Sequence, residues 1–493
     1  MMHGHGKSDS PIVLAKPPNE AEPEAKEVVE GRGLAKGKTP ERNMSRTQGR
    51  SGMSSALERI RQAARREKRQ RFTALLHHVY DVEGLRAAYF GLKRAAAAGI
   101  DGKTWRHYGE ELERNLLDLS ERLRRGAYRA QPVRRAYITK VGEPQKLRPL
   151  GVLVLEDKIA QRAATEVLSA LYEQDFVGFS YGFRPGKSPH QALDALVMAI
   201  LRRKVNWVLD CDIRGFFDTL DHGWLVKFIE HRVGDRRVLR LIGKWLRAGV
   251  FEEGKWTETG VGTPQGSVIS PFLANVYLHY VLDLWVRHWR KHRAQGDVIV
   301  VRYADDFVMG FQHRLEAERC LQELRERLGK FGLELHPEKT RLIEFGRFAA
   351  ERRSEAGLGK PETFSFLGFT HYCGKTRKGA FTIKRQSMAK RMRAKLLEIK
   401  AQLKRQMHST VAEMGAWLRS VVRGWFNYHA VPGNSPSLGR FRNEVGRIWF
   451  GVLRRRSQKF RRRRWHYMAR LIRYWLPSTR ILHPYPNERL AVT

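Results

Sequence analysis

The sequence contains few cysteines and no long apolar segment. Its three cysteines, Cys211, Cys320 and Cys373, are far apart and show no CxxC spacing, which argues against a disulfide framework or a zinc knuckle and favours core thiols. There is no run of about 20 apolar residues, and the first residues, MMHGHGKSDS, lack the apolar core of a signal peptide. We therefore expect a cytoplasmic protein that does not span a membrane.

Acidic residues are also scarce relative to basic ones. The 493 residues include 92 Lys and Arg but only 51 Asp and Glu, which gives a formal net charge of +41. Such a surplus predicts a polyanionic partner, and nucleic acid is the first candidate. Over half of the surplus lies in the last 110 residues, where 26 basic residues stand against four acidic ones.

The chain is long enough for two or three domains with buried cores, since 42% of its residues are hydrophobic. Residues 1–52 are an exception, because they mix Pro, Gly, Lys and Glu with almost no aromatic residues. Such a composition cannot bury enough apolar surface to offset the entropy of ordering, so we expect a disordered basic arm. Helical spacing follows in RFTALLHHVY and GLRAAYFGLKRA, with Asp81 and Gly99 as the expected boundaries.

Extended segments alternate with helices further along the chain. Residues 133–149 predict a hairpin rich in Lys and Arg, and residues 156–172 predict a helix. NWVLDCDI (206–213) predicts a strand on which Asp210 and Asp212 point the same way. VIVVRYADDFVMGF (298–311) consists of two apolar runs around residues 303–306, which predicts a hairpin with acidic residues at its bend.

The rest of the chain is expected to be helical apart from one more hairpin. Residues 315–328 favour a helix, and residues 364–383 favour a hairpin with its turn near 374–379. One apolar stripe follows on a helix crowded with Lys and Arg, formed by Met392, Leu396, Ile399, Leu403 and Met407.

Three carboxylates are expected to meet at strand ends. Asp305 and Asp306 lie at the bend of one hairpin, and Asp212 ends an upstream strand. An isolated Asp-Asp pair is more often a solvated turn, but here buried-type strands flank it. Carboxylates suit Mg²⁺, and two ions about 3.5–4 Å apart can activate an attacking hydroxyl while stabilising a leaving oxygen. The pattern therefore predicts nucleotidyl transfer.

The order of the motifs resembles a known family. LDCDIRGFFDTLDH, GTPQGSVISPFLANVYL, VRYADDFV, LHPEKTRLIEF and FLGF follow one another as the palm motifs of group II intron-encoded reverse transcriptases do, and RGWFNYHAVPGN (423–434) is similar to their thumb, or maturase, region. The resemblance implies an α+β right-hand polymerase, with fingers and palm built from an antiparallel sheet plus helices and followed by an α-helical thumb. It implies fingers and palm with an N-terminal helical extension over 53–370, and a thumb/maturase RNA-binding domain over 371–493.

The resemblance carries the catalytic and metal-binding roles onto particular residues. The catalytic carboxylates are Asp212, Asp305 and Asp306, and the site for two Mg²⁺ ions also includes Ile213. Among the neighbouring acids only Asp212 has the aromatic residue that the family places five positions later. That residue, Phe217, resembles the steric gate that excludes a ribose 2′-hydroxyl, with an ordinary core phenylalanine as the alternative.

Nucleotide-binding residues follow in the same way. Gln265 matches the glutamine that packs against the incoming nucleotide and template, and Gly266 beside it lets the backbone come close. Arg148 resembles the fingers arginine that faces the triphosphate. Its lysine partner is either Lys140 or Lys146, and a solvated hairpin charge is the alternative for both.

Two further motifs resemble parts of the family's site. Lys339, in HPEK, resembles the lysine near the leaving pyrophosphate. Phe366, Leu367 and Gly368 resemble the primer-grip turn, with an ordinary hairpin core as the alternative.

The basic C-terminal helices are interpreted as an RNA-binding surface. Their arginines are Arg423, Arg454, Arg455, Arg456, Arg461, Arg462, Arg463 and Arg464. They are interleaved with aromatic residues, a mixture suited to phosphate contact and stacking on unpaired bases, namely Trp425, Tyr428, Trp449, Trp465 and Tyr467. The alternative is a solvated helix face.

The resemblance implies an RNA-directed DNA polymerase that binds its host group II intron RNA. It further implies assistance in splicing as a maturase, and retrohoming by target-primed reverse transcription. The expected partners are intron RNA, an RNA template, a DNA primer or target, and deoxynucleotides. No Cys- and His-rich nuclease signature follows the thumb, so the form without a C-terminal endonuclease is expected. The alternatives are a domesticated reverse transcriptase in host defence or diversification, and a splicing-only maturase.

Overall fold

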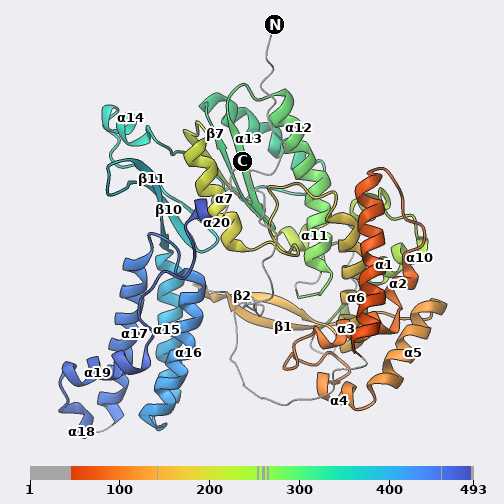
Figure 1. The fold of residues 1–493 in the computed structure, drawn as a ribbon, viewed down its shortest axis with the longest axis horizontal. Coiled ribbons are helices and arrows are strands. Elements are labelled where there is room, and N and C mark those ends of the chain that lie inside the picture. Colours follow the sequence, from red (N-terminus) through yellow and green to blue (C-terminus); the bar gives the residue numbers. More distant parts are fainter. Residues whose placement is uncertain are drawn as a thin grey trace.

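The computed structural model describes residues 46–140, 143–252, 255–257, 261–263, 266–456 and 458–489. Most of the expected N-terminal arm lies outside these residues, and its last part, residues 46–52, begins helix α1. Helices combine with three sheets into the α+β fold that the sequence predicts. In Figure 1 the N-terminal helices lie on the right, a central sheet above, and the C-terminal helices at the lower left.

The N-terminal region combines helices with a strand pair. Its elements are α1 (Arg46–Arg66), α2 (Leu76–Val79), α3 (Val82–Phe90), α4 (Trp105–Glu110), α5 (Leu112–Arg125), β1 (Val133–Lys140), β2 (Glu143–Val152) and α6 (Leu155–Tyr172). The expected boundary residue Asp81 caps α3, because its carboxylate accepts a hydrogen bond from the Gly84 N–H at 2.9 Å. The expected hairpin is formed by β1 and β2, and β4 (Val250–Glu252) and β5 (Lys255–Thr257) complete the sheet order β2-β1-β4-β5.

The middle of the chain builds the central sheet, which has the order β6-β7-β3-β8 and is antiparallel throughout. Its elements are α7 (Pro189–Arg202), β3 (Trp207–Asp212), α8 (Phe216–Thr219), α9 (His222–Glu230), α10 (Arg236–Leu246), α11 (Ser270–Leu278), the π-helix η1 (His279–Asp283), α12 (Leu284–His292), β6 (Val298–Tyr303), β7 (Asp306–Phe311), α13 (Arg314–Gly329), β8 (Arg341–Glu344) and α14 (Ala349–Glu355). The predicted acidic strand is β3, and the predicted acidic hairpin is β6–β7.

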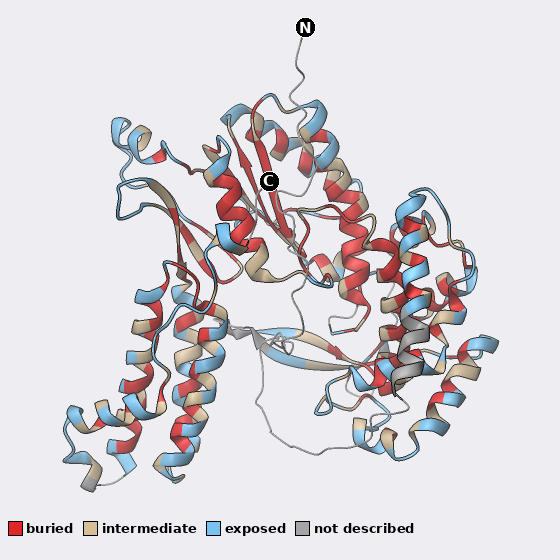
Figure 2. Cartoon of the chain, viewed as in Figure 1, coloured by how far each residue is buried: buried red, intermediate tan, exposed pale blue. Residues whose placement is uncertain are grey.

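Two hydrophobic cores cover the two faces of the central sheet. Because side chains alternate along a strand, Leu209 and Cys211 face the larger core, which also contains the N-terminal helices. Val208 and Val308 face a second core formed with α7 and the strands that follow β8. Figure 2 shows the buried strands of this sheet between buried helix faces.

The C-terminal region adds a small sheet and a helical bundle. Its elements are β9 (Phe364–Phe366), β10 (Phe369–Lys375), β11 (Phe381–Ser387), α15 (Ala389–Arg405), α16 (Val411–His429), α17 (Ser435–Arg456), α18 (Gln458–Arg461), α19 (Trp465–Trp475) and α20 (Pro486–Arg489). The predicted turn near residues 374–379 joins β10 to β11, and the predicted apolar stripe of α15 faces a third core. The expected domain boundary at 370/371 falls within β10.

Burial of the cysteines agrees with the predicted core thiols for two of the three. Cys211 and Cys320 are buried and free, and Cys373 is free and half-buried. Among the described residues, no helix is both long enough and apolar enough to cross a bilayer.

Candidate active site

Two strands of the central sheet place Asp212 directly opposite Asp306. Asp212 ends β3 and pairs with Asp306, the first residue of β7, in antiparallel register. Directly opposed residues on one sheet face have Cβ atoms about 4.5–5.5 Å apart. Asp305 lies in the two-residue turn that joins Tyr303 to Asp306. The sheet therefore brings together the three carboxylates that the sequence singles out.

The turn that carries Asp305 has an unusual backbone. Ala304 adopts a φ of +57°, which costs a residue with a Cβ about 1 kcal/mol or more. Gly182 packs against this turn so closely that a Cβ there would lie 2.3 Å from the Ala304 nitrogen. Only glycine fits at position 182, so the segment beside β6 supports the strained turn from outside.

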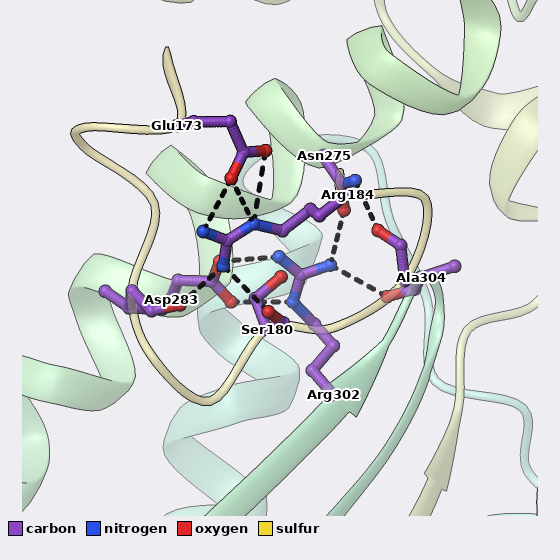
Figure 3. A network of polar contacts seen from close by, with 9 residues as sticks. Glu173, Ser180, Arg184, Asn275, Asp283, Arg302 and Ala304 are labelled. Carbon is purple, nitrogen blue, oxygen red and sulfur yellow. Dashed lines mark hydrogen bonds and ion pairs between the residues drawn. The ribbon is translucent and has the colours of Figure 1, made fainter. Parts of the chain in front are cut away.

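A fully buried arginine holds the same turn from within. Arg302 is 0% exposed, and its guanidinium donates a hydrogen bond of 3.0 Å to the carbonyl oxygen of Ala304. The same Nη1 donates to Asn275 Oδ1 at 3.1 Å, and Nε and Nη2 donate to the two carboxylate oxygens of Asp283 at 2.7 and 2.6 Å. Figure 3 shows these bonds converging beneath the turn.

The partners of Arg302 are themselves fixed. Asp283 is 0% exposed and ends the π-helix η1, a rare element that is often found at functional sites. Asn275 also donates to the Gly182 carbonyl at 2.7 Å, which ties α11 to the segment beside the turn. A second arginine, Arg184, donates to the carbonyls of Val177 and Ser180 at 2.8 and 2.7 Å, so it orders that segment in turn.

The sequence reasoning missed this network. A signal for it was present, because an arginine interrupts the apolar run VIVVRY, and a charged residue inside a buried strand needs a buried partner. The position of that partner carried no comparable signal, since nothing in the sequence marks the π-helix that presents Asp283.

Burial and mutual repulsion shape the charge of the carboxylates. Burial raises the pKa of Asp306 well above its usual value, and the charges of Asp210, Asp305 and Asp212 add to this effect. Burial also raises the pKa of Asp305, with a further contribution from Asp212 and opposing ones from Arg148 and Arg302. Ionising the whole group is therefore costly unless positive charge is supplied.

Asp210 is a fourth carboxylate on the same face of the sheet. It lies two residues before Asp212 on β3, and burial raises its pKa to about 6. Arg341 on β8 approaches it to 3.8 Å. Its charge is the largest electrostatic influence from another residue on Asp306, so it belongs to the electrostatics of the site even though the sequence pattern favoured Asp212.

Lys339 lies against Asp212. Its Nζ is 2.6 Å from Asp212 Oδ2, and the His336 N–H donates to the Asp212 carbonyl at 2.7 Å, so the HPEK segment is anchored to the end of β3. This ion pair is partly exposed, and its contribution to stability is accordingly small. The structure thus places the expected pyrophosphate lysine beside Asp212, one of the three carboxylates expected to be catalytic.

The donor chemistry of the site suits a hard divalent cation. As the described side chains stand, no three carboxylate, imidazole or thiolate groups converge closely enough to hold a metal ion. Nevertheless, Asp212, Asp305 and Asp306 offer oxygen ligands only. A divalent cation would stabilise their ionised forms, which burial and mutual repulsion disfavour by raising the pKa values of Asp305 and Asp306. The side chain of Ile213 is a buried hydrocarbon without donor atoms, so this residue can offer a metal ion only its carbonyl oxygen.

Phe217 sits beside the nucleotide-binding segment expected around Gln265. It is half-buried on α8, and its carbonyl accepts a hydrogen bond of 2.7 Å from the Thr263 N–H. Gly262 packs on the same turn, where a Cβ would lie 2.9 Å from the Phe217 carbonyl oxygen. Gln265 itself lies outside the described residues. Residues 262–263, which precede Gln265, are therefore bound to the backbone of Phe217, the expected gate.

The strand β2 brings Arg148 within electrostatic reach of Asp305. Arg148 is exposed, and its charge lowers the pKa of the Asp305 carboxyl. Gly266 has a φ of +106° and lies against the backbone of Gly151 in β2. A Cβ at position 266 would lie 2.7 Å from the Gly151 carbonyl oxygen, so glycine is needed for this contact. The side chains of Lys140 and Lys146 lie outside the described part of the chain.

The expected primer-grip residues form a tight turn between β9 and β10. Leu367 and Gly368 both have positive φ, +48° and +83°, as a two-residue hairpin of type I′ requires. The Leu367 carbonyl accepts a hydrogen bond of 2.8 Å from the Tyr428 hydroxyl of α16. Phe366 is buried in the core shared with the central sheet, so the turn connects that sheet to the C-terminal helices.

The expected RNA-binding arginines are exposed on the C-terminal helices, but most of the aromatic residues are not available for stacking. All eight arginines are exposed. In contrast, Trp449 is completely buried, Trp425 stacks on Phe441, and Tyr428 is bonded to Leu367. The expectation of five stacking aromatics was therefore wrong for these three, because Trp449 and Trp425 pack in the third core and Tyr428 packs against the second.

These features define a class of protein. The central antiparallel sheet with opposed carboxylates, the preceding helical and hairpin region, and the following helical bundle are the palm, fingers and thumb of an α+β right-hand polymerase. The chain belongs to the reverse transcriptase (RNA-dependent DNA polymerase) family, whose sequence profile matches residues 138–371.

Similar proteins include several that introns encode. The chain is 34% identical over 285 residues to Protein YkfC of Escherichia coli (strain K12), which covers 51% of this chain and 73% of that protein. It is 36% identical over 242 residues to the group II intron-encoded protein LtrA of Lactococcus lactis subsp. cremoris, covering 48% of this chain. It is 26% identical over 314 residues to the putative COX1/OXI3 intron 1 protein of Saccharomyces cerevisiae, covering 54% of this chain. The matches span 39% and 37% of the lengths of these two intron proteins.

Proposed function

We propose that the protein is an RNA-directed DNA polymerase that extends a DNA primer with deoxynucleotides on an RNA template. The observation that carries this proposal is the register of the palm sheet, in which Asp212 lies opposite Asp306 with Asp305 in the adjoining turn. A reverse transcriptase profile over residues 138–371 supports the same conclusion.

We assign a pair of Mg²⁺ ions to Asp212, Asp305 and Asp306, with the Ile213 carbonyl as a further ligand. Bound there, the ions would activate the primer 3′-hydroxyl and stabilise the leaving pyrophosphate oxygen. Arg302 fixes the backbone of the turn, so Asp305 and Asp306 are held in place before any substrate arrives. Preorganisation of this kind is how an enzyme avoids spending free energy on rearrangement during the reaction.

Other residues are assigned to the nucleotide. Arg148 is permanently charged and lies within electrostatic reach of Asp305, so it would neutralise part of the negative charge of a triphosphate bound there. Lys339 offers a second cation close to Asp212 for the leaving pyrophosphate. Phe217 is assigned to the sugar gate and Gln265 to packing on the base pair, and the bond from Thr263 to Phe217 couples these two assignments.

We further propose that the protein binds its host group II intron RNA, assists its splicing and supports retrohoming by target-primed reverse transcription. The support is the similarity to an intron-encoded protein and the exposed arginines of α17 and the segment before α19. Arginine is suited to phosphate because its planar fork donates two parallel hydrogen bonds. The proposed domain boundaries remain 53–370 for fingers and palm and 371–493 for the thumb.

The test of the polymerase is primer extension on an RNA template with Mg²⁺. We expect Asp305→Asn to lower the extension rate about 100-fold or more, because a metal ligand of this kind contributes several kcal/mol and each 1.4 kcal/mol is tenfold in rate. The matched control is Asp118→Asn, an exposed aspartate of α5 that pairs with Arg122. Equal extension by the parent and Asp305→Asn would remove the catalytic assignment, and binding of intron RNA by both variants would separate the two proposed activities.

A further inference from the structure

An open pocket of about 530 Å³ lies on the thumb between α17 and α19. Among the described residues it is lined by Asn443, Arg447 and Phe450 of α17 and by Trp465, which begins α19. The three residues of α17 are four and three positions apart, so they occupy one face of that helix. We call these four residues the thumb pocket.

The thumb pocket exposes an aromatic ring that the protein could have buried. Trp465 is 46% exposed, whereas the other four tryptophans of the thumb belong to its core or pack against it, namely Trp417, Trp425, Trp449 and Trp475. The Trp465 ring meets Phe450 edge to face, with centroids 5.5 Å apart. This contact positions the indole beside the pocket while leaving nearly half of it open to solvent.

Polar groups in the thumb pocket complement the edge of a nucleobase. The Asn443 amide is exposed and has no hydrogen-bond partner among the described residues, so it offers both a donor and an acceptor. Arg447 adds donors and is held by Glu444, whose carboxylate lies 2.7 Å from its Nη1. An amide, a guanidinium and an aromatic face are the groups that proteins use to hold unpaired bases.

A phosphate-binding element adjoins the thumb pocket. Arg464 is the N-cap residue of α19, no side chain caps this helix, and its first turn contains no acidic residue. The positive end of the helix is therefore open to an anion. The exposed residues 461–464 are all arginine, and the Arg454 guanidinium lies 5.6 Å from the centroid of the Phe450 ring. Groups suited to a base and groups suited to a phosphate thus adjoin each other, because Arg464 directly precedes Trp465 in the chain.

We propose that the thumb pocket binds one unpaired nucleotide of a single-stranded RNA segment. The base stacks on Trp465 with its edge at Asn443 and Arg447, and its phosphate lies at the start of α19 beside residues 461–464. This inference rests on the proposed function, in which the thumb contacts RNA, and it names the part of that RNA that is recognised. Charge alone would attract any duplex, whereas the thumb pocket requires a base that is free of its partner.

The test measures binding of the full chain to a twelve-nucleotide oligouridine RNA that carries one central 2-aminopurine, whose fluorescence is quenched by stacking. We expect Trp465→Ala to weaken binding about 5- to 150-fold and to abolish the quenching, which corresponds to the usual contribution of one base stacked on an aromatic side chain. Trp465→Phe should retain most of both. Tyr474→Ala is the matched control, because Tyr474 lies on the same helix, is 71% exposed and does not line the pocket.

Two further arms separate stacking from charge. Trp465→Ala should leave the salt dependence of RNA binding unchanged, whereas replacing Arg461 to Arg464 with serine should flatten it. A twelve-base-pair RNA duplex should bind the parent and Trp465→Ala equally. The proposal is overturned if Trp465→Ala binds the single strand like the parent, or loses single-strand and duplex binding alike. Primer extension by the parent reports on the polymerase independently, so failure of that function and failure of the pocket can be told apart.

Discussion

The buried pair of Arg302 and Asp283 offers a way to separate the stability of the palm from the geometry of the turn that carries Asp305. Both side chains are 0% exposed and joined by two short hydrogen bonds. Removing one partner, as in Asp283→Leu, leaves the other charge buried, and such changes cost about 3–5 kcal/mol. The free energy of unfolding of an ordinary domain is about 5–15 kcal/mol in total. We therefore expect Asp283→Leu to lose a large part of it, measured by urea unfolding.

A double replacement gives the sharper test. Arg302→Met with Asp283→Leu removes both charges, and hydrophobic replacement of a buried ion pair is often neutral in stability or better. The double variant still lacks the hydrogen bond to the Ala304 carbonyl, which as a charge-assisted bond contributes about 1.5–3 kcal/mol. If this bond holds Asp305 and Asp306 for catalysis, extension should fall about 10- to 150-fold in a protein that loses less stability in urea than Asp283→Leu does.

The conservative variant Arg302→Lys completes the series. A lysine retains the charge opposite Asp283, but its compact ammonium cannot reach Asp283, Asn275 and Ala304 together as the guanidinium does. We expect stability close to that of the parent and an extension rate between those of the parent and the double variant. Rapid extension by the double variant at parental rates would refute the positioning role, and parental stability of Asp283→Leu would refute the buried-charge argument.

Two other residues allow direct tests of what the structure predicts. Phe217→Ala should relax discrimination against ribonucleotides, measured as the ratio of extension rates with deoxynucleotides and ribonucleotides; unchanged discrimination would reject the gate. Burial raises the pKa of the Asp157 carboxyl to about 6, against the opposing effect of the hydrogen bonds it accepts from Tyr128 and Gln131. The contribution of Asp157 to stability is therefore complete below about pH 4 and is lost as the pH rises through 6. Asp157→Asn should therefore gain about 3 kcal/mol on the parent between pH 4 and 7 in urea unfolding, and a constant difference would contradict this.

The sequence predicted the local elements of the site well because their signals are local. Alternation and apolar runs identified β3 and the β6–β7 hairpin, and the acidic residues between the runs marked the bend. The pairing of β3 with β7 could not be deduced, because the two strands are far apart in sequence and no local pattern specifies a neighbour. Lys339 shows the same limit, since its contact with Asp212 depends on how residues 335 and 213 pair.

The burial of the thumb aromatics could have been predicted more accurately. Trp449 lies in a stripe of α17 with Leu438, Phe441, Val445 and Val452, at spacings of three and four residues that indicate a core face. Weighting that periodicity above the neighbouring arginines would have assigned Trp449 to the core. Trp465 begins a similar stripe on α19 with Met468, Ile472 and Trp475, so its spacing alone would also have assigned it to the core. Its 46% exposure follows only from its position at the start of α19 beside α17, where it lines a pocket.

The thumb and the central sheet are connected through the turn at residues 366–368, the expected primer grip. Tyr428 of α16 donates to the Leu367 carbonyl, and the Tyr428 carbonyl lies 2.8 Å from His190 Nε2 on α7, which covers the central sheet. Phe366 shares a core with Val308, two residues beyond Asp306 on β7, which is proposed to be catalytic. Because this core is close-packed, a shift of α16 cannot occur without moving the turn or breaking these bonds. If the proposed functions hold, RNA bound on the thumb would influence how the palm holds a primer, and the proposed splicing and polymerase activities would have a physical route by which each affects the other.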